Sequence, residues 1–291
     1  MRSTDRPGAG IALMIAATAV FALQDGVSRH LAETYNVLMV VMIRYWFFAA
    51  FVIALARRRA GGLRAAAASG YPLLQAFRGA LLALEICVTV LSFVLLGLVE
   101  THAIFAVYPL LVAALSGPVL GERVGWRRWG AIALGLVGVL VILQPGRGLF
   151  SPAALIPLAG AFGFALYGLL TRLVARRDST ETSFFWTGTV GAAVMTLAGI
   201  GFWEPLAPAD WGWMALLCVS GALGHWLLIR SYELAEASAV QPFAYLQLVF
   251  VTAIGITVFG EALRPEVALG AALVIGAGLF TLRRNRLREG R

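Results

Sequence analysis

The nine residues 21–29, Phe-Ala-Leu-Gln-Asp-Gly-Val-Ser-Arg, occur a second time in altered form. Residues 164–172 read Phe-Ala-Leu-Tyr-Gly-Leu-Leu-Thr-Arg, so the start matches and a hydroxyl residue followed by Arg ends both copies. Later motifs recur in the same order: Gly121-Glu122 as Gly260-Glu261, and Gly130-Ala131 as Gly270-Ala271. A unit that recurs along the whole chain predicts two structural repeats.

Composition places these repeats in a membrane. The chain is 60% hydrophobic and 13% charged, with a mean hydropathy of +0.85, which is more apolar surface than a soluble core can bury. A helix needs about 20 mostly apolar residues to cross a bilayer. We therefore predict ten transmembrane helices and no soluble domain, at residues 9–31, 37–57, 73–96, 101–120, 126–143, 153–175, 182–202, 211–234, 238–259 and 265–283.

The break between the halves is predicted at Gln144-Pro145-Gly146-Arg147-Gly148, where Pro and Gly interrupt the apolar pattern. This gives one five-helix repeat over residues 1–145 and a second over 146–291. Five is an odd number, so the second repeat must begin on the side of the membrane where the first one ended. The predicted fold is thus all-α, with two inverted five-helix repeats, an architecture typical of secondary transporters.

The net charge of +8 indicates topology rather than a nucleic-acid partner. With ten spans, most arginines fall on one side of the membrane, at 2, 6, 57–59, 64, 123, 127, 128, 176, 177, 283, 284, 286, 288 and 291, against chiefly Arg29, Arg147 and Arg264 on the other. The positive-inside rule then places both termini in the cytoplasm. We predict a multi-pass protein of the bacterial inner membrane, monomeric or weakly dimeric.

These motifs resemble a known family. The duplicated five-span unit, the Gly-Glu at the end of each fourth span and the short loops are similar to the EamA branch of the drug/metabolite transporter superfamily, with a closer resemblance to bacterial aromatic amino acid exporters. The resemblance covers essentially the whole chain. It implies ten helices in two inverted halves and the export of amino acids or related metabolites.

Ionisable residues inside a bilayer are costly and are functional candidates by default. Asp25 and Arg44 lie at similar depth on neighbouring antiparallel spans and are predicted to pair, with Arg29, one turn along, as a second partner for Asp25. The pair could be a structural ion pair, or a charged patch that acts as a gate.

Four polar residues follow one helical stripe of the third predicted span: Arg78, Glu85, Thr89 and Ser92. Such a stripe must face other helices or water. In the second repeat Thr89 aligns with His225, so Glu85 and His225 are predicted to face one another. Together they could bind a substrate ammonium group, carry a coupling proton or do both; the structural alternative is a buried hydrogen-bonded pair.

Other polar and aromatic residues favour a central cavity with apolar walls. Gln24 and Tyr167 occupy equivalent places in the two repeats, Gln241 and Tyr245 share one face of the ninth span, and His102 and Tyr108 lie on the fourth. Spans 5 and 10 carry glycine and alanine at four-residue spacing and almost no polar side chains, so we interpret them as peripheral packing helices.

No sequence motif indicates an enzyme, a metal site or a cofactor. Cys87 and Cys218 lie inside apolar spans and are predicted to fill the core, and Ser220 and His225 point to different faces of one helix. The expected function is alternating-access export of amino acids, aromatic ones included, with proton coupling as one option. A carrier of drugs, nucleobases or other metabolites, and a facilitative channel, are the alternatives.

Overall fold

The computed structural model describes residues 6–58, 61–121, 126–143, 152–235, 240 and 243–289, and the regular elements among these residues are helices, with no strand. In chain order the elements are α1 (Pro7–Ala32), α2 (Val37–Arg57), α3 (Gly62–Ala67), α4 (Pro72–Phe105), α5 (Tyr108–Leu120), α6 (Trp126–Leu143), η1 (Pro152–Ala154), α7 (Leu155–Val174), α8 (Thr180–Gly199), η2 (Ile200–Phe202), α9 (Asp210–Leu234), α11 (Leu246–Phe259) and α12 (Pro265–Glu289).

Six of these helices are long and apolar enough to cross a membrane: α1, α2, α4, α7 with η1, α8 with η2, and α9. Shorter apolar helices occupy residues 108–120, 132–142, 246–259 and 265–277. Large apolar side chains are exposed on the outside of the bundle, among them Leu84, Leu197 and Phe51. Such a surface suits hydrocarbon rather than water.

Local sequence explains where several helices begin and end. Asn36 and Ser179 cap α2 and α8 by accepting hydrogen bonds from the backbone N–H groups of Leu38 and Thr182. Gly121 and Gly260 end α5 and α11 with positive φ angles of 76° and 65°, a conformation that favours glycine.

The third and fourth predicted spans meet without a loop. At Gly97 the backbone leaves the helical conformation, with φ 79° and ψ 174°, and the chain turns back. Thr101 Oγ1 consequently donates to the Ser92 carbonyl at 3.0 Å, although nine residues of straight helix would span about 13.5 Å. The fourth span is then interrupted between Phe105 and Tyr108, because Pro109 starts a new helix and lacks a backbone N–H.

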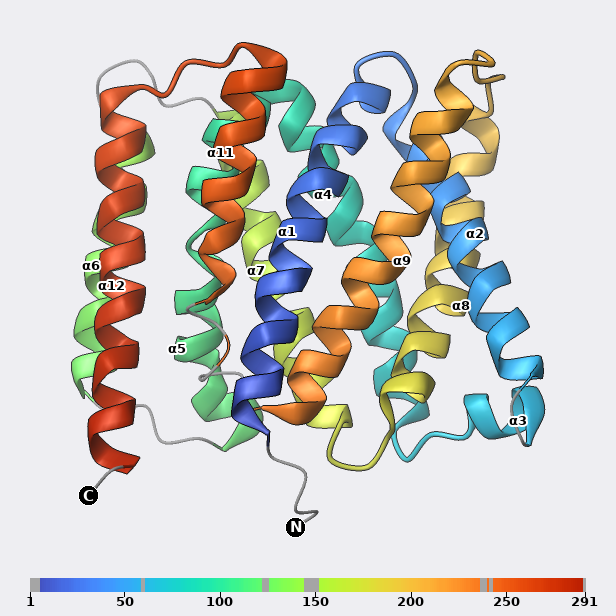
Figure 1. The fold of residues 1–291 in the computed structure, drawn as a ribbon, viewed down its shortest axis with the longest axis horizontal. Helices are drawn as coiled ribbons and strands as arrows, with labels where there is room; N and C mark the ends of the chain where they lie inside the picture. The colour runs from blue at the N-terminus through green and yellow to red at the C-terminus, as the bar shows by residue number, and fades with distance from the viewer. Residues whose placement is uncertain are drawn as a thin grey trace.

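The helices interleave the two halves of the chain. Helix α1 packs on α9 and α11, α4 packs on α7 and α8, and α2 packs on α8. Figure 1 shows the long helices running side by side, both termini at one end of the bundle, and α6 and α12 paired at one edge. We call the end that holds the termini and α3 the near end, and the opposite one the far end.

Candidate functional site: a central polar cavity

A cavity of about 40 Å³ lies in the middle of the bundle, where α1, α2, α4, α7, α9 and α11 meet. Its lining combines charged and amide groups with aromatic rings: Phe21, Gln24, Asp25, Arg44, Glu85, Ile86, Thr89, Val90, Phe93, His102, Phe105, Phe164, His225 and Gln247. The lining therefore contains two carboxyl groups, one guanidinium group and two imidazoles. Ionisable groups inside a membrane protein are costly, so this cavity is the candidate functional site.

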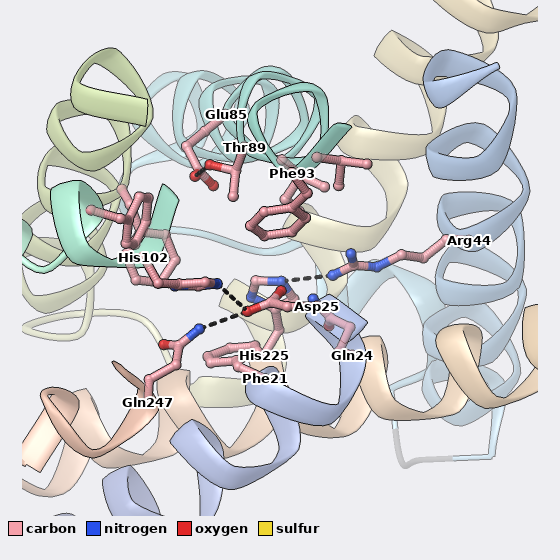
Figure 2. Close-up of a pocket in the computed structure, with 14 residues that line it drawn as sticks. Phe21, Gln24, Asp25, Arg44, Glu85, Thr89, Phe93, His102, His225 and Gln247 are labelled. Carbon is pink, nitrogen blue, oxygen red and sulfur yellow. Dashed lines mark hydrogen bonds and ion pairs between the residues drawn. The ribbon is translucent and has the colours of Figure 1, made fainter. Parts of the chain in front are cut away.

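Asp25 on α1 joins three helices. Its Oδ2 accepts a hydrogen bond from Gln247 Nε2 of α11 at 2.9 Å and lies 3.1 Å from His102 Nε2 of α4 (Figure 2). The sequence predicted Arg44 or Arg29 as its partner, and this pairing is wrong. The turn at Gly97 brings His102 back to α1, while Arg29 pairs with Glu33 and Glu261 instead.

Arg44 on α2 reaches α9 rather than α1. Its Nη2 lies 3.1 Å from His225 Nε2, and the guanidinium lies against Gly221, where a Cβ atom would come within 2.6 Å of Arg44 Nε. His225 also packs against the rings of Phe21 and Phe48. Arg44 and His225 therefore form one polar pair on the cavity wall.

Glu85 and Thr89 lie on the α4 face of the cavity, as the helical stripe predicted. Thr89 Oγ1 donates to Glu85 Oε1 at 2.6 Å. Helix α7 approaches this stripe through Gly160 and Gly163, which lie against Thr89 and Glu85. Glu85 and His225 line the same cavity, but the hydrogen-bond partner of the His225 ring is Arg44 rather than Glu85.

Arg78, the first member of the stripe, lies away from the cavity in a network of its own. Its guanidinium is fully buried and donates to side chains of α4, α7 and α8 and to one backbone carbonyl: Gln75 Oε1, Tyr167 Oη, Thr171 Oγ1, Thr187 Oγ1 and the Ser183 carbonyl, at 2.5–3.1 Å. Gln75 in turn donates to Asp178. Arg78 and Tyr167 are thus not part of the cavity lining. Their polar atoms bond to each other and to other helices, toward the near end of the bundle.

Two predicted cavity tyrosines are also outside the lining. Tyr108 is buried against Phe105 and Phe164, and Tyr245 is buried at the start of α11. Gln24 lines the cavity as predicted. Gln241 lies outside the described residues.

Sequence reasoning missed much of the lining. The four phenylalanines carry no sequence signal that separates a cavity-facing ring from a lipid-facing one. Gln247 could have been found, because an amide in an apolar helix requires a buried partner. His102 was noticed on the fourth span, but its contact with Asp25 depends on the turn at Gly97.

Comparison with known proteins identifies the family. The sequence model of the EamA-like transporter family matches residues 8–144 and again 151–283, and the chain belongs to this family. It is therefore a multi-pass inner-membrane protein of a transporter family.

Relatives of known name differ in what they carry. The chain is 30% identical to a riboflavin transporter of Rhizobium johnstonii, covering 84% of this chain and 82% of the relative, and 26% identical to a riboflavin transporter of Vibrio cholerae over 92% and 91%. It is 24% identical to an S-adenosylmethionine uptake transporter of Rickettsia prowazekii over 94% and 92%. A crystal structure 19% identical in sequence shares the fold, with a TM-score of 0.68 and coverage of 96% of this chain and 99% of that one.

Proposed function

We propose that this protein is an alternating-access carrier of a planar heteroaromatic metabolite, with riboflavin as the first candidate. The observation that carries the proposal is the composition of the cavity wall. Four phenylalanine rings and two imidazoles surround the cavity together with amide and charged groups. Aromatic walls with few polar groups suit a flat ring system that bears hydrogen-bonding substituents.

Each part of the wall has a distinct role in this proposal. Phe21, Phe93 and Phe164 offer ring faces and edges for stacking, while Gln24 and the Asp25–Gln247 pair offer hydrogen bonds to ring heteroatoms and hydroxyl groups. The cavity is too small for such a solute in the described conformation, because 40 Å³ is far below the roughly 300 Å³ or more of a ligand-binding pocket. Helices around the cavity must therefore separate to admit the solute.

The names of the relatives support a metabolite carrier rather than the amino acid exporter expected from the closer resemblance. We accordingly keep amino acids as comparison solutes. The topology remains part of the proposal: ten spans in two inverted repeats, with the termini in the cytoplasm. Two successive family matches and the location of both termini at one end of the bundle support it.

A second candidate, S-adenosylmethionine, is favoured by the charges of the cavity. Among the described lining residues, Asp25 and Glu85 supply two carboxyl groups against one guanidinium group, that of Arg44. A sulfonium cation would balance the excess carboxylate in a site shielded from water. Riboflavin is uncharged and would require a proton at one of these groups.

The test is solute counterflow in proteoliposomes that contain the purified protein. Labelled riboflavin, S-adenosylmethionine and phenylalanine are each supplied outside, with and without the same unlabelled solute inside. We expect riboflavin accumulation that depends on preloading, because a carrier exchanges solute through one site. Preferential exchange of S-adenosylmethionine would support the second candidate, flux indifferent to preloading would indicate a channel, and exchange of phenylalanine alone would contradict both heteroaromatic candidates.

A further inference from the structure

The turn at Gly97 leaves two backbone N–H groups without helical acceptors. The segment Leu98–Phe105 begins a new direction, so the N–H groups of its first turn have no carbonyl one turn behind them. Glu261, from the second half of the chain, supplies the missing acceptors: Oε1 accepts from Leu98 N at 2.8 Å and Oε2 from Val99 N at 2.7 Å. One carboxylate thus caps a helical segment that lies in a different repeat.

The surroundings of Glu261 are shaped to hold this carboxylate. A Cβ atom at Gly97 would come within 2.9 Å of Glu261 Oε1, and one at Gly255 within 3.1 Å of Oε2. Arg29 of α1 forms an ion pair with Glu261 and stacks over the ring of Phe259 at 4.3 Å. The carboxylate therefore fastens α1, α4 and α11 to one another at the far end.

Two of the elements that Glu261 joins, α1 and the α4 segment, also meet inside the cavity. On α1, Arg29 follows Asp25 by one helical turn, and in the α4 segment His102 follows Leu98 by one turn, so each pair lies on one helix face. Arg29 and Leu98 contact Glu261, while Asp25 and His102 contact each other in the cavity. Displacement of the segment from Glu261 would also move His102 relative to Asp25.

We infer that Glu261 is a positioning residue that latches the far end of the bundle and sets His102 against Asp25. Release of its carboxylate would let α11 and α1 separate from the α4 segment, which opens the cavity toward the far end. In this inference, the Gly-Glu motif at residues 260–261 controls whether the far end of the bundle is open or closed. This inference rests on the proposed alternating-access carrier.

The test measures access to the cavity without any solute. A reporter cysteine replaces the cavity residue Val90 in a protein whose Cys87 and Cys218 are changed to alanine. A membrane-impermeant maleimide is then applied either to intact cells or to inside-out vesicles. We expect Glu261→Gln to raise the labelling rate from the far side roughly tenfold, the change that follows the loss of a charge-assisted hydrogen bond.

A second variant disrupts the contact between Glu261 and the α4 segment without removing the carboxylate. In Gly97→Ala the added Cβ must displace Glu261, and the positive φ disfavours alanine, so labelling from the far side should rise as well. Glu266→Gln, which weakens the Arg264–Glu266 pair outside the α4 segment, and Gly212→Ala, where a Cβ meets no atom of the described residues within 4 Å, are the matched controls and should leave labelling unchanged.

Each outcome has a defined meaning. Unchanged labelling in Glu261→Gln, or an equal rise in its control, overturns the latch; if Glu261→Gln fails to purify as a monodisperse protein, Gly97→Ala and its control decide in the same way. Because labelling needs no solute, these results are separate from the counterflow assay. If the wild-type protein exchanges none of the solutes while the variants show the labelling changes, the result contradicts the proposed substrate and leaves the latch standing.

Discussion

Asp25 is the side chain that connects the helices around the cavity to one another. It is 6% exposed and holds one imidazole and one amide, from two other helices. A buried carboxylate needs such partners, because an unpaired charge in a low-dielectric interior is strongly destabilising. These contacts must break when the helices separate, so the interactions of Asp25 couple the opening of the cavity to the positions of α1, α4 and α11.

Asp25→Asn should impair transport more than folding. Asparagine keeps the shape and can still accept from Gln247, but it loses the charge that holds His102. We expect exchange of the preferred solute to fall by roughly tenfold or more, as for loss of a charged hydrogen bond, with an unchanged elution profile in detergent. Glu266→Gln, near the bundle surface, is the control, and full activity of Asp25→Asn would remove Asp25 from the binding site.

Glu85→Gln tests proton coupling. Glutamine can still accept from Thr89 through its carbonyl oxygen, so the local packing is retained while the titratable proton is lost. We expect transport to be abolished, or to continue without its dependence on pH, measured as counterflow and as gradient-driven uptake across a pH series. Thr89→Val removes the hydrogen bond but not the carboxyl group and should keep the pH dependence. If Glu85→Gln transports solute at the wild-type rate and with the same pH dependence, Glu85 is excluded as the coupling group.

At the scale of the element, close backbone contact holds α6 and α12 at the edge of the bundle. A Cβ atom at Gly138 would come within 2.7 Å of the Gly270 carbonyl oxygen, and one at Gly270 within 2.5 Å of the Gly138 carbonyl. Within a membrane such helix pairs associate through close packing, which small residues permit. The sequence predicted that these two helices pack at the periphery through glycine and alanine, and the structure shows that they pack on one another.

Gly138→Ala should therefore destabilise the α6–α12 pair. The obstructing atom is a backbone carbonyl, which cannot rotate away, so the helices must move apart at a cost of about 1–3 kcal/mol. The measurement is the thermal unfolding midpoint in detergent, which we expect to fall. Gly130→Ala on the same helix meets no atom of the described residues within 4 Å and should not lower the midpoint. Equal midpoints for the two variants would show that this contact is unimportant.

The sequence was a good guide to elements and a poor one to contacts between them. Hydropathy alone located the apolar segments, because the bilayer demands long uninterrupted apolar runs. The predicted spans 73–96 and 101–120 placed a reversal of the chain between them, but not the tight turn at Gly97, where no loop separates the two helical segments. The His102–Asp25 contact depends on the geometry of that turn, so it could not be predicted. The stripe of Glu85 and Thr89 was predictable, because it depends only on the periodicity of one helix.

At the scale of the whole molecule, one polar network lies on each side of the cavity. Glu261 with Arg29 joins helices at the far end, and Arg78 with its partners joins α4 to α7 and α8 toward the near end. Both networks connect the first half of the chain with the second. A carrier must open one end while the other stays closed, so weakening either network should shift the population of states in a direction of its own.

Arg78→Lys should therefore open the cavity toward the near side, whereas Glu261→Gln should open it toward the far side. Lysine keeps the charge, but its compact ammonium group cannot replace a planar guanidinium that serves Tyr167, Thr171 and Thr187 at once. With the Val90→Cys reporter, we expect faster labelling from the near side in Arg78→Lys and from the far side in Glu261→Gln. Thr187→Val, which removes one partner only, should change labelling in the same direction as Arg78→Lys but less. If both networks affected the same side, or neither, they would be packing features of a rigid bundle, and the alternating opening of the two ends would have to be sought in other contacts.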